Sequence, residues 1–216
     1  MKPTQADLAL MSNTPVEMVP MLGEFEPMQR IGHRFLAAKD GLWLEARRPW
    51  GRVVWPLAHQ DPMVRMPFGA LTPDVQLAFE LPTECIDQFV RDAKIAHPAE
   101  VGAAVIWNSR TCTVRYHLCE TITAGEGHLR ERWPELSEEE SVCIDLHSHG
   151  PIPAYFSSED RKDTGSEMVV AVVVGKLDRN EPEVAMSLFA CGVELSMLAP
   201  GSRLVDMNGW GNTCQR

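Results

Sequence analysis

The sequence has little of what marks nucleic-acid-binding or membrane-spanning proteins. Its 20 lysines and arginines are outnumbered by 30 aspartates and glutamates, which gives a formal net charge of −10. Because phosphate backbones are bound mainly through lysine and arginine, this balance argues against a nucleic acid as partner. The most apolar run, residues 168–175, is eight residues long, whereas a membrane-spanning helix needs about 20. We therefore expect no membrane partner.

The sequence also lacks secretory and redox signatures. Its first residues do not have the charged-then-apolar layout of a secretory signal, so we expect a cytoplasmic protein. The six cysteines contain no C-x-x-C pair, which argues against a zinc ribbon and a thioredoxin-type site. With 44% hydrophobic and 23% charged residues, the composition is that of an ordinary globular protein.

Residues 1–80 are rich in proline and methionine and are predicted to form a small β-containing extension of unknown function. Strand-like segments at 41–46 and 52–56 flank a turn signal, Arg-Pro-Trp-Gly, at 48–51. Three tryptophans lie close together there: Trp43, Trp50 and Trp55. They form either a docking surface or a local core, and aromatic residues on short strands favour the core.

A second domain is expected over residues 81–216. Apolar residues at three-and-four spacing predict a helix from Thr83 to His97, followed by a hairpin over 101–118. The polar segment 124–140 is predicted to be a loop or a short helix.

The remaining pattern of this domain is mainly that of strands. Alternation predicts a strand over 142–149, and a short helix is expected to start at Ser157. The continuous apolar run at 168–175 is typical of a strand that is buried on both faces. A final hairpin is expected over 183–198.

The chemically informative segment lies between these elements. Alternate residues of a strand point to one face, so His147 and His149 can present two imidazoles to one metal ion. A reversal of the chain would bring Asp160 back as a third ligand. Two histidines and one carboxylate leave a fourth position for water, which is the arrangement of a catalytic zinc site.

Each part of this pattern also has a simpler explanation. Ser157 followed by Asp160 is an ordinary helix-capping signature, and a lone H-x-H is more often incidental. Capping does not exclude metal ligation, however. The joint occurrence of both parts, after an apolar strand, favours a metal site.

This segment resembles the JAMM motif of the JAB/MPN-type metalloproteases. In that motif H-x-H is followed after seven residues by S-x-x-D, which His147, His149, Ser157 and Asp160 match. The family also has a glutamate upstream at a helix-to-strand junction, and Glu100 stands in a similar context here. Many members have proline directly after the second histidine, where this chain has glycine. The resemblance covers about residues 81–200.

The resemblance implies an α/β (α+β) fold: an MPN/JAB-type mixed β-sheet flanked by helices, with cytidine-deaminase-like architecture. It implies one zinc ion per chain held by His147, His149 and Asp160, with Glu100 as general base and Ser157 as oxyanion donor. Other glutamates and histidines of this domain compete for these roles: Glu120, Glu126, Glu159, His117 and His128.

The implied activity is hydrolysis of a peptide or isopeptide bond at the tail of a ubiquitin-like protein. The chain is similar to the PRTRC group of prokaryotic JAB proteins, which implies a ThiF/E1-like partner from the same gene cassette. A metal-free MPN-type scaffold is the alternative. Residues 145–149 also resemble the D-L-H-x-H opening of PHP-type metallophosphoesterases, but that class needs more ligands downstream and no histidine follows His149.

Overall fold

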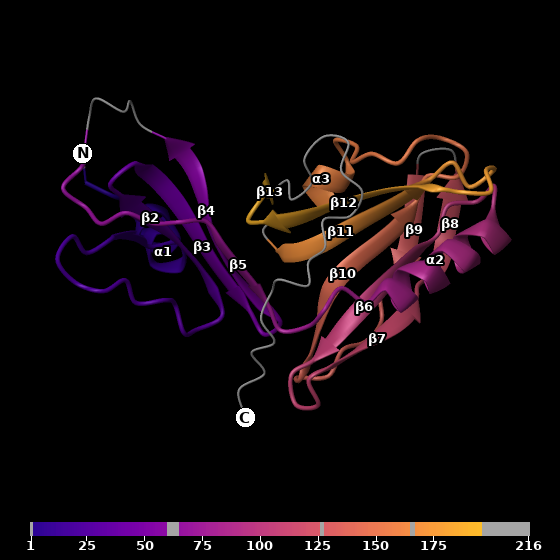
Figure 1. Cartoon of the computed structure of the whole chain (residues 1–216), viewed down its shortest axis with the longest axis horizontal. Coiled ribbons are helices and arrows are strands. Elements are labelled where there is room, and N and C mark those ends of the chain that lie inside the picture. The colour runs from indigo at the N-terminus through magenta and orange to yellow at the C-terminus, as the bar shows by residue number, and fades with distance from the viewer. Residues whose placement is uncertain (1, 60–64, 126–127, 165–166, 196–216) are drawn as a thin grey trace. The chain divides into compact units, whose positions relative to one another are not determined.

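The computed structural model (Figure 1) describes residues 2–59, 65–125, 128–164 and 167–195, without the side chains of 123–125, 128–130 and 163. The chain divides into two compact units, Met1–Leu77 and Ala78–Arg216. Within the described ranges, no helix is long and apolar enough to cross a membrane.

The first unit is a five-stranded sheet with one helix. Its strands follow the order β1-β2-β3-β4-β5, with β1 parallel to β2 and the other neighbours antiparallel. The elements are α1 (Gln5–Asn13), β1 (Val16–Met18), β2 (Gly32–Ala38), β3 (Gly41–Arg48), β4 (Gly51–His59) and β5 (Asp74–Leu77). The two strands expected at 41–46 and 52–56 are thus present as β3 and β4.

The interior of the first unit contains both aromatic and charged groups. Trp43 and Trp50 are almost fully buried, so these two tryptophans are core residues rather than a docking surface. Glu45 is 0% exposed, and its carboxylate accepts hydrogen bonds from Arg34 Nε at 2.7 Å and Arg52 Nε at 2.8 Å. The buried charge of Glu45 is therefore paired on both sides, as a buried carboxylate requires.

The second unit contains a six-stranded mixed sheet with the strand order β13-β12-β11-β10-β6-β7 (Figure 1). Strands β10 and β11 are parallel, and the other neighbours are antiparallel. The elements of this sheet and its helices are α2 (Thr83–Ala96), β6 (Gly102–Asn108), β7 (Thr113–Leu118), β10 (Glu140–Ser148), α3 (Asp160–Asp163), β11 (Met168–Gly175), β12 (Glu183–Ala190) and β13 (Val193–Leu195). This is the mixed α+β fold that the sequence predicted.

Two predictions for this unit need correction. Part of the segment predicted as a loop or short helix is instead a strand, because β8 (Glu120–Gly125) and β9 (His128–Arg132) form an antiparallel hairpin. The β-branched residues of β8 favour an extended backbone despite their polar surroundings. The short helix begins at Asp160 rather than at Ser157, which lies in the preceding turn.

The two faces of the six-stranded sheet have different roles. Tyr116 on β7 donates a hydrogen bond to Asp92 of α2 at 2.8 Å, and Tyr116 is paired with Val105, which is paired with Ile144. Helix α2 therefore covers the face of these residues. Side chains alternate between the two faces along a strand. His147 lies three residues after Ile144 on β10, so it points to the opposite face.

Candidate metal centre

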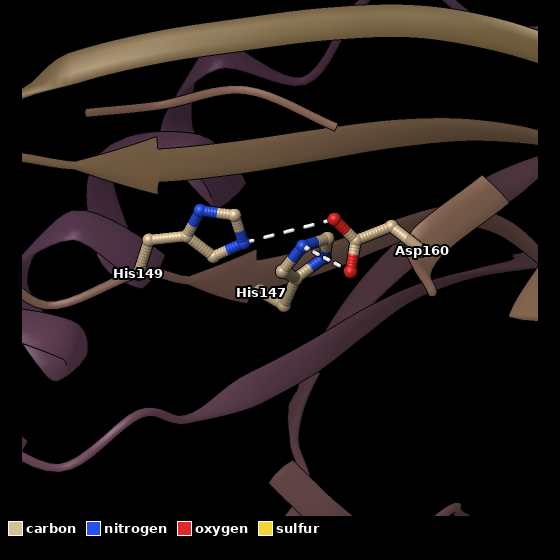
Figure 2. Close-up of side chains that lie close together, drawn as sticks. All are labelled: His147, His149 and Asp160. Carbon is tan, nitrogen blue, oxygen red and sulfur yellow. Dashed lines mark ion pairs between the residues drawn. The ribbon is translucent and has the colours of Figure 1, made fainter. Parts of the chain in front are cut away.

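Three predicted ligands meet at the end of β10. His147 lies on β10, His149 directly follows it, and Asp160 is the first residue of α3 (Figure 2). Nε2 of His147 is 3.3 Å from Oδ1 of Asp160, and Nε2 of His149 is 3.7 Å from Oδ2. The potential ligand atoms of the three residues all lie within 4.8 Å of one another. The structure thus brings together residues that are up to 13 positions apart in the sequence.

The backbone that carries the histidines is held on both sides. The amide of Ser148 donates to the carbonyl of Val101 at 3.0 Å, and that of His149 donates to Val174 at 2.8 Å. These bonds tie the end of β10 to β11 on one side and to the residue before β6 on the other. The two imidazoles are therefore presented from a fixed backbone.

Asp160 is held by reciprocal hydrogen bonds with Ser157. The amide of Asp160 donates to Ser157 Oγ at 3.1 Å, and the amide of Ser157 donates to Asp160 Oδ2 at 2.6 Å. The two bonds have the reciprocal pattern of a capping box, but they lie in the turn before α3, whose N-cap residue is Glu159. Since Oδ1 of the same carboxylate faces His147, the capping bonds orient Asp160 toward the histidines instead of competing with ligation.

The electrostatics of the three residues are linked. Burial alone would raise the pKa of Asp160, but His147 and the hydrogen bonds from Ser157 outweigh burial and lower it. Burial opposes protonation of His147, yet the Asp160 carboxylate, together with Asp145 and Glu131, raises its pKa. For His149, burial and then the charge of His147 lower the pKa. An ionised carboxylate and a neutral imidazole are the ligand forms that a metal ion requires.

The donor set fits a zinc ion. Nε2 of His147 is buried, and its one polar contact among the described residues is the 3.3 Å approach to Oδ1 of Asp160, which does not have the geometry of a hydrogen bond. Buried polar atoms rarely stay without a well-formed hydrogen bond, and a cation between the three side chains would bind both this nitrogen and the facing carboxylate oxygen. Two histidines with one carboxylate are also a known ligand set of catalytic zinc. Within the described ranges, these three residues are the one such group of potential metal ligands.

Glu100 is placed beside this group by its neighbours in the chain. The amide of Val101 donates to Ser148 Oγ at 3.0 Å, which fixes the residue after Glu100 next to the residue between the two histidines. The Glu100 side chain is partly buried. Burial raises its pKa, and the charges of His147 and Asp160 also act on it, so its carboxylate lies within their electrostatic influence.

The competing candidates are placed less favourably. Glu120 is exposed and forms an ion pair with Arg132, and Glu159 is exposed. His117 lies on β7 and is not part of the ligand group. Glu126 and the side chain of His128 lie outside the described residues.

Two residues near the centre were not predicted as site residues. Tyr155 is 48% exposed, and its ring lies edge-on to His149 with the ring centroids 5.0 Å apart. Glu131 on β9 has a partly buried carboxylate whose charge acts on His147. The sequence contained no signal for Glu131, because its strand was predicted as a loop.

Family models match both parts of the chain. Residues 82–189, half of the chain, match the family model described as prokaryotic homologs of the JAB domain. Residues 4–78 match a domain of unknown function, DUF2016. No curated protein is similar enough to count as a match. Among solved structures, the solution structure of protein DSY2949 from Desulfitobacterium hafniense is 15% identical with a TM-score of 0.35, covering 50% of this chain and 81% of that protein.

Proposed function

The chain belongs to the family of prokaryotic homologues of the JAB domain, and on this premise we propose that it is a zinc-dependent metallopeptidase or isopeptidase. The observation that carries the proposal is the group of His147, His149 and Asp160, whose donor atoms lie within 4.8 Å of one another. Glu100 and Ser157 complete the set of residues that the chemistry needs.

The metal site consists of residues with the required chemistry. His147, His149 and Asp160 would hold the zinc, which lowers the pKa of a bound water toward about 7 and polarises the carbonyl to be attacked. The buried Nε2 of His147, which faces the Asp160 carboxylate at 3.3 Å without a well-formed hydrogen bond, supports this assignment.

Glu100 is the proposed general base. Its partly buried carboxylate has a raised pKa, for which burial is the main cause. A carboxylate with a pKa closer to neutrality both accepts and returns a proton more readily at physiological pH. In the proposed reaction Glu100 accepts a proton from the attacking water and then delivers it to the leaving amine.

Ser157 is the proposed donor to the developing oxyanion. Its Oγ accepts hydrogen bonds from the amides of Glu159 at 3.2 Å and Asp160 at 3.1 Å. Both bonds use the oxygen as acceptor, which leaves the hydroxyl hydrogen available to donate to the scissile carbonyl oxygen. In other enzymes the loss of one such donor costs about 3 kcal/mol of transition-state stabilisation.

The substrate and partner are part of the same proposal and rest on the family resemblance. We propose that the substrate is the extended C-terminal tail of a ubiquitin-like protein, joined to an amine or a short extension. The ThiF/E1-like protein of the same gene cassette is the proposed partner. The exposed side chains of Ile152 and Tyr155, on the loop between the ligands, offer apolar contacts for such a tail.

Elemental analysis of purified protein tests the proposal. Wild type and Glu100→Gln should each contain about one zinc per chain, and His149→Ala should contain little, because a ligand is lost. Only wild type should cleave a ubiquitin-like fusion. If wild type takes up no zinc even after reconstitution, the hydrolase is excluded and the metal-free scaffold becomes the better account. Zinc-loaded protein whose Glu100→Gln variant cleaves as fast as wild type would exclude the role of Glu100.

A further inference from the structure

Glu131 brings a partly buried carboxyl group to the metal centre from the β8–β9 hairpin. Its side chain lies at the end of β9, and its Oε2 atom is buried without a hydrogen-bond partner among the described residues. Burial, followed by the charge of Asp145, raises the pKa of this carboxyl to about 7. A carboxylate placed in this way is costly unless a positive charge lies nearby.

Gly102 makes room for this carboxylate. A β-carbon at Gly102 would lie 1.8 Å from Oε2 and 2.7 Å from Oε1 of Glu131, so the carboxylate occupies the space that any other residue would fill with its side chain. The conflict is at the oxygen atoms rather than at the backbone of the hairpin. The position of the Glu131 carboxylate therefore depends on glycine at position 102.

The position over Gly102 also places Glu131 next to a metal ligand. Gly102 lies directly opposite His147 in the antiparallel register of β6 and β10. Residues that face each other across such a pair have β-carbons about 4.5–5.5 Å apart on the same face of the sheet. The carboxylate over Gly102 thus lies on the face to which His147 points, close to its β-carbon.

We propose that Glu131 is a positioning residue of the metal centre: its carboxylate, seated over Gly102, supplies negative charge beside His147 and so strengthens zinc binding. The inference rests on the proposed zinc site and adds a residue to it. Asp145 supports the same effect, since it lies two positions before His147 on the same face of β10 and its charge also acts on His147.

The physical basis is related to the carboxylates that are found beside histidine ligands in general. Carboxylates that accept a hydrogen bond from a ligand histidine orient it and increase its basicity, and their loss weakens metal affinity by about 10- to 100-fold. Glu131 acts on His147 through its charge without such a bond, so we expect an effect at the lower end of this range. Here a cation bound at the three ligands would also compensate for burying Glu131. The negative charge and the metal would thus stabilise each other.

Zinc affinity, measured by competition with a chromogenic chelator, tests the inference. Glu131→Gln keeps the volume of the side chain and removes its charge, so we expect the dissociation constant to rise by about tenfold. Gly102→Ala should cause a similar rise because it displaces the carboxylate. The double variant should be little worse than either single variant, since both remove one interaction. Glu120→Gln, on the partner strand of the hairpin with its side chain 68% exposed, is the matched control and should bind zinc as wild type does.

A second readout separates charge from simple packing. In cobalt-loaded protein the visible absorption bands report the geometry of the ligands, and we expect them to shift in Glu131→Gln but not in Glu120→Gln. If Glu131→Gln binds zinc as tightly as wild type and leaves the cobalt spectrum unchanged, the inference is wrong although the zinc site stands. If wild type itself binds no zinc, both the site and the inference fail.

Discussion

Ser148 stands between the two histidines of the metal centre and points the other way. Its hydroxyl oxygen accepts a hydrogen bond from the amide of Val101, and its own amide donates to the carbonyl of the same residue. Ser148 is 1% exposed, so water cannot replace these bonds. The residue between the ligands therefore fixes the backbone that carries Glu100.

Ser148→Ala is expected to lower the free energy of unfolding by about 1–3 kcal/mol, because a buried amide loses its partner. Zinc content should stay near one per chain, whereas kcat should fall because Glu100 is no longer held in place. Urea denaturation and a cleavage assay measure the two effects. Ser141→Ala on the same strand is the control, since the buried Oγ of Ser141 has no partner among the described residues; an equal loss in both variants would contradict the role of Ser148.

Glu131 predicts a pH dependence of stability in the metal-free protein. Burial, with the charge of Asp145, raises its pKa in the folded state from the ordinary value of 4.5 to about 7. The folded state thus binds this proton more tightly than the unfolded state. The stability that the group contributes is fully present below pH 4.5 and is lost as the pH rises through about 7.

Glutamine at position 131 cannot titrate, so the Glu131→Gln variant should not lose this stability as the pH rises. Relative to wild type, the chelator-treated variant should become more stable between pH 5 and pH 8, as measured by the urea midpoint at each pH. A difference between the two proteins that does not change with pH would show that Glu131 titrates near its ordinary value when folded.

At the scale of elements, the strength of the local pattern decided what could be predicted. Helix α2 and strand β11 have long, regular apolar patterns, and the H-x-H at the end of β10 follows a clear alternation. The strand β9 has no apolar alternation of its own, because its hairpin is a separate two-stranded sheet. Its strand character, and with it Glu131, could not be found from the local sequence.

The site itself was predictable only where its residues follow each other closely. His147, His149 and Asp160 share one strand–loop–helix segment, so their spacing carries information. The contact between Glu131 and Gly102 joins two strands that are not paired with each other. It depends on tertiary packing, which no local spacing encodes.

The loop between the second histidine and Asp160 is positioned by β11. A β-carbon at Gly175 would lie 2.4 Å from the amide nitrogen of Ala154 and 2.5 Å from the carbonyl oxygen of Ile152. The last residue of β11 therefore has no room for a side chain while the loop stays in place. Because the loop leads into α3, its course helps to set the position of Asp160.

Gly175→Ala should displace this loop and weaken zinc binding by about tenfold or more, as misplaced supporting groups do in other metal sites. Chelator competition measures the change. Gly23→Ala is the control, since its new β-carbon would meet only Cβ of Pro20 at 3.5 Å. Unchanged zinc affinity in Gly175→Ala would mean that Asp160 is placed independently of the loop.

At the scale of the whole molecule, the chain consists of two units with separate interiors. The first has Trp43 and the paired charge of Glu45 in its interior, and the second has the six-stranded sheet that carries the metal centre. The donor atoms of the metal centre all come from the second unit. Damage to the interior of the first unit is therefore expected to leave the ligands in place.

Glu45→Ala tests this separation. Removing the carboxylate leaves Arg34 and Arg52 without their buried partner, which typically costs about 3–5 kcal/mol. In thermal unfolding, the midpoint temperature of the first transition should fall. The zinc content should match that of wild type. Glu17→Ala is the control: Glu17 also pairs with Arg34 but is largely solvent-accessible, so its loss should cost about 1 kcal/mol or less. Loss of zinc in Glu45→Ala would show that the units depend on each other.

The hydrogen bonds on both sides of the end of β10 have a further consequence for how metal is gained and lost. Two of the three donors sit on backbone that folding itself has already ordered. In zinc fingers, by contrast, the apo chain is unfolded and the metal drives folding. A metal ion bound at this centre would therefore be removed and returned while the sheet stays intact, so under the proposed function the loaded fraction would follow the supply of free zinc rather than the rate of refolding.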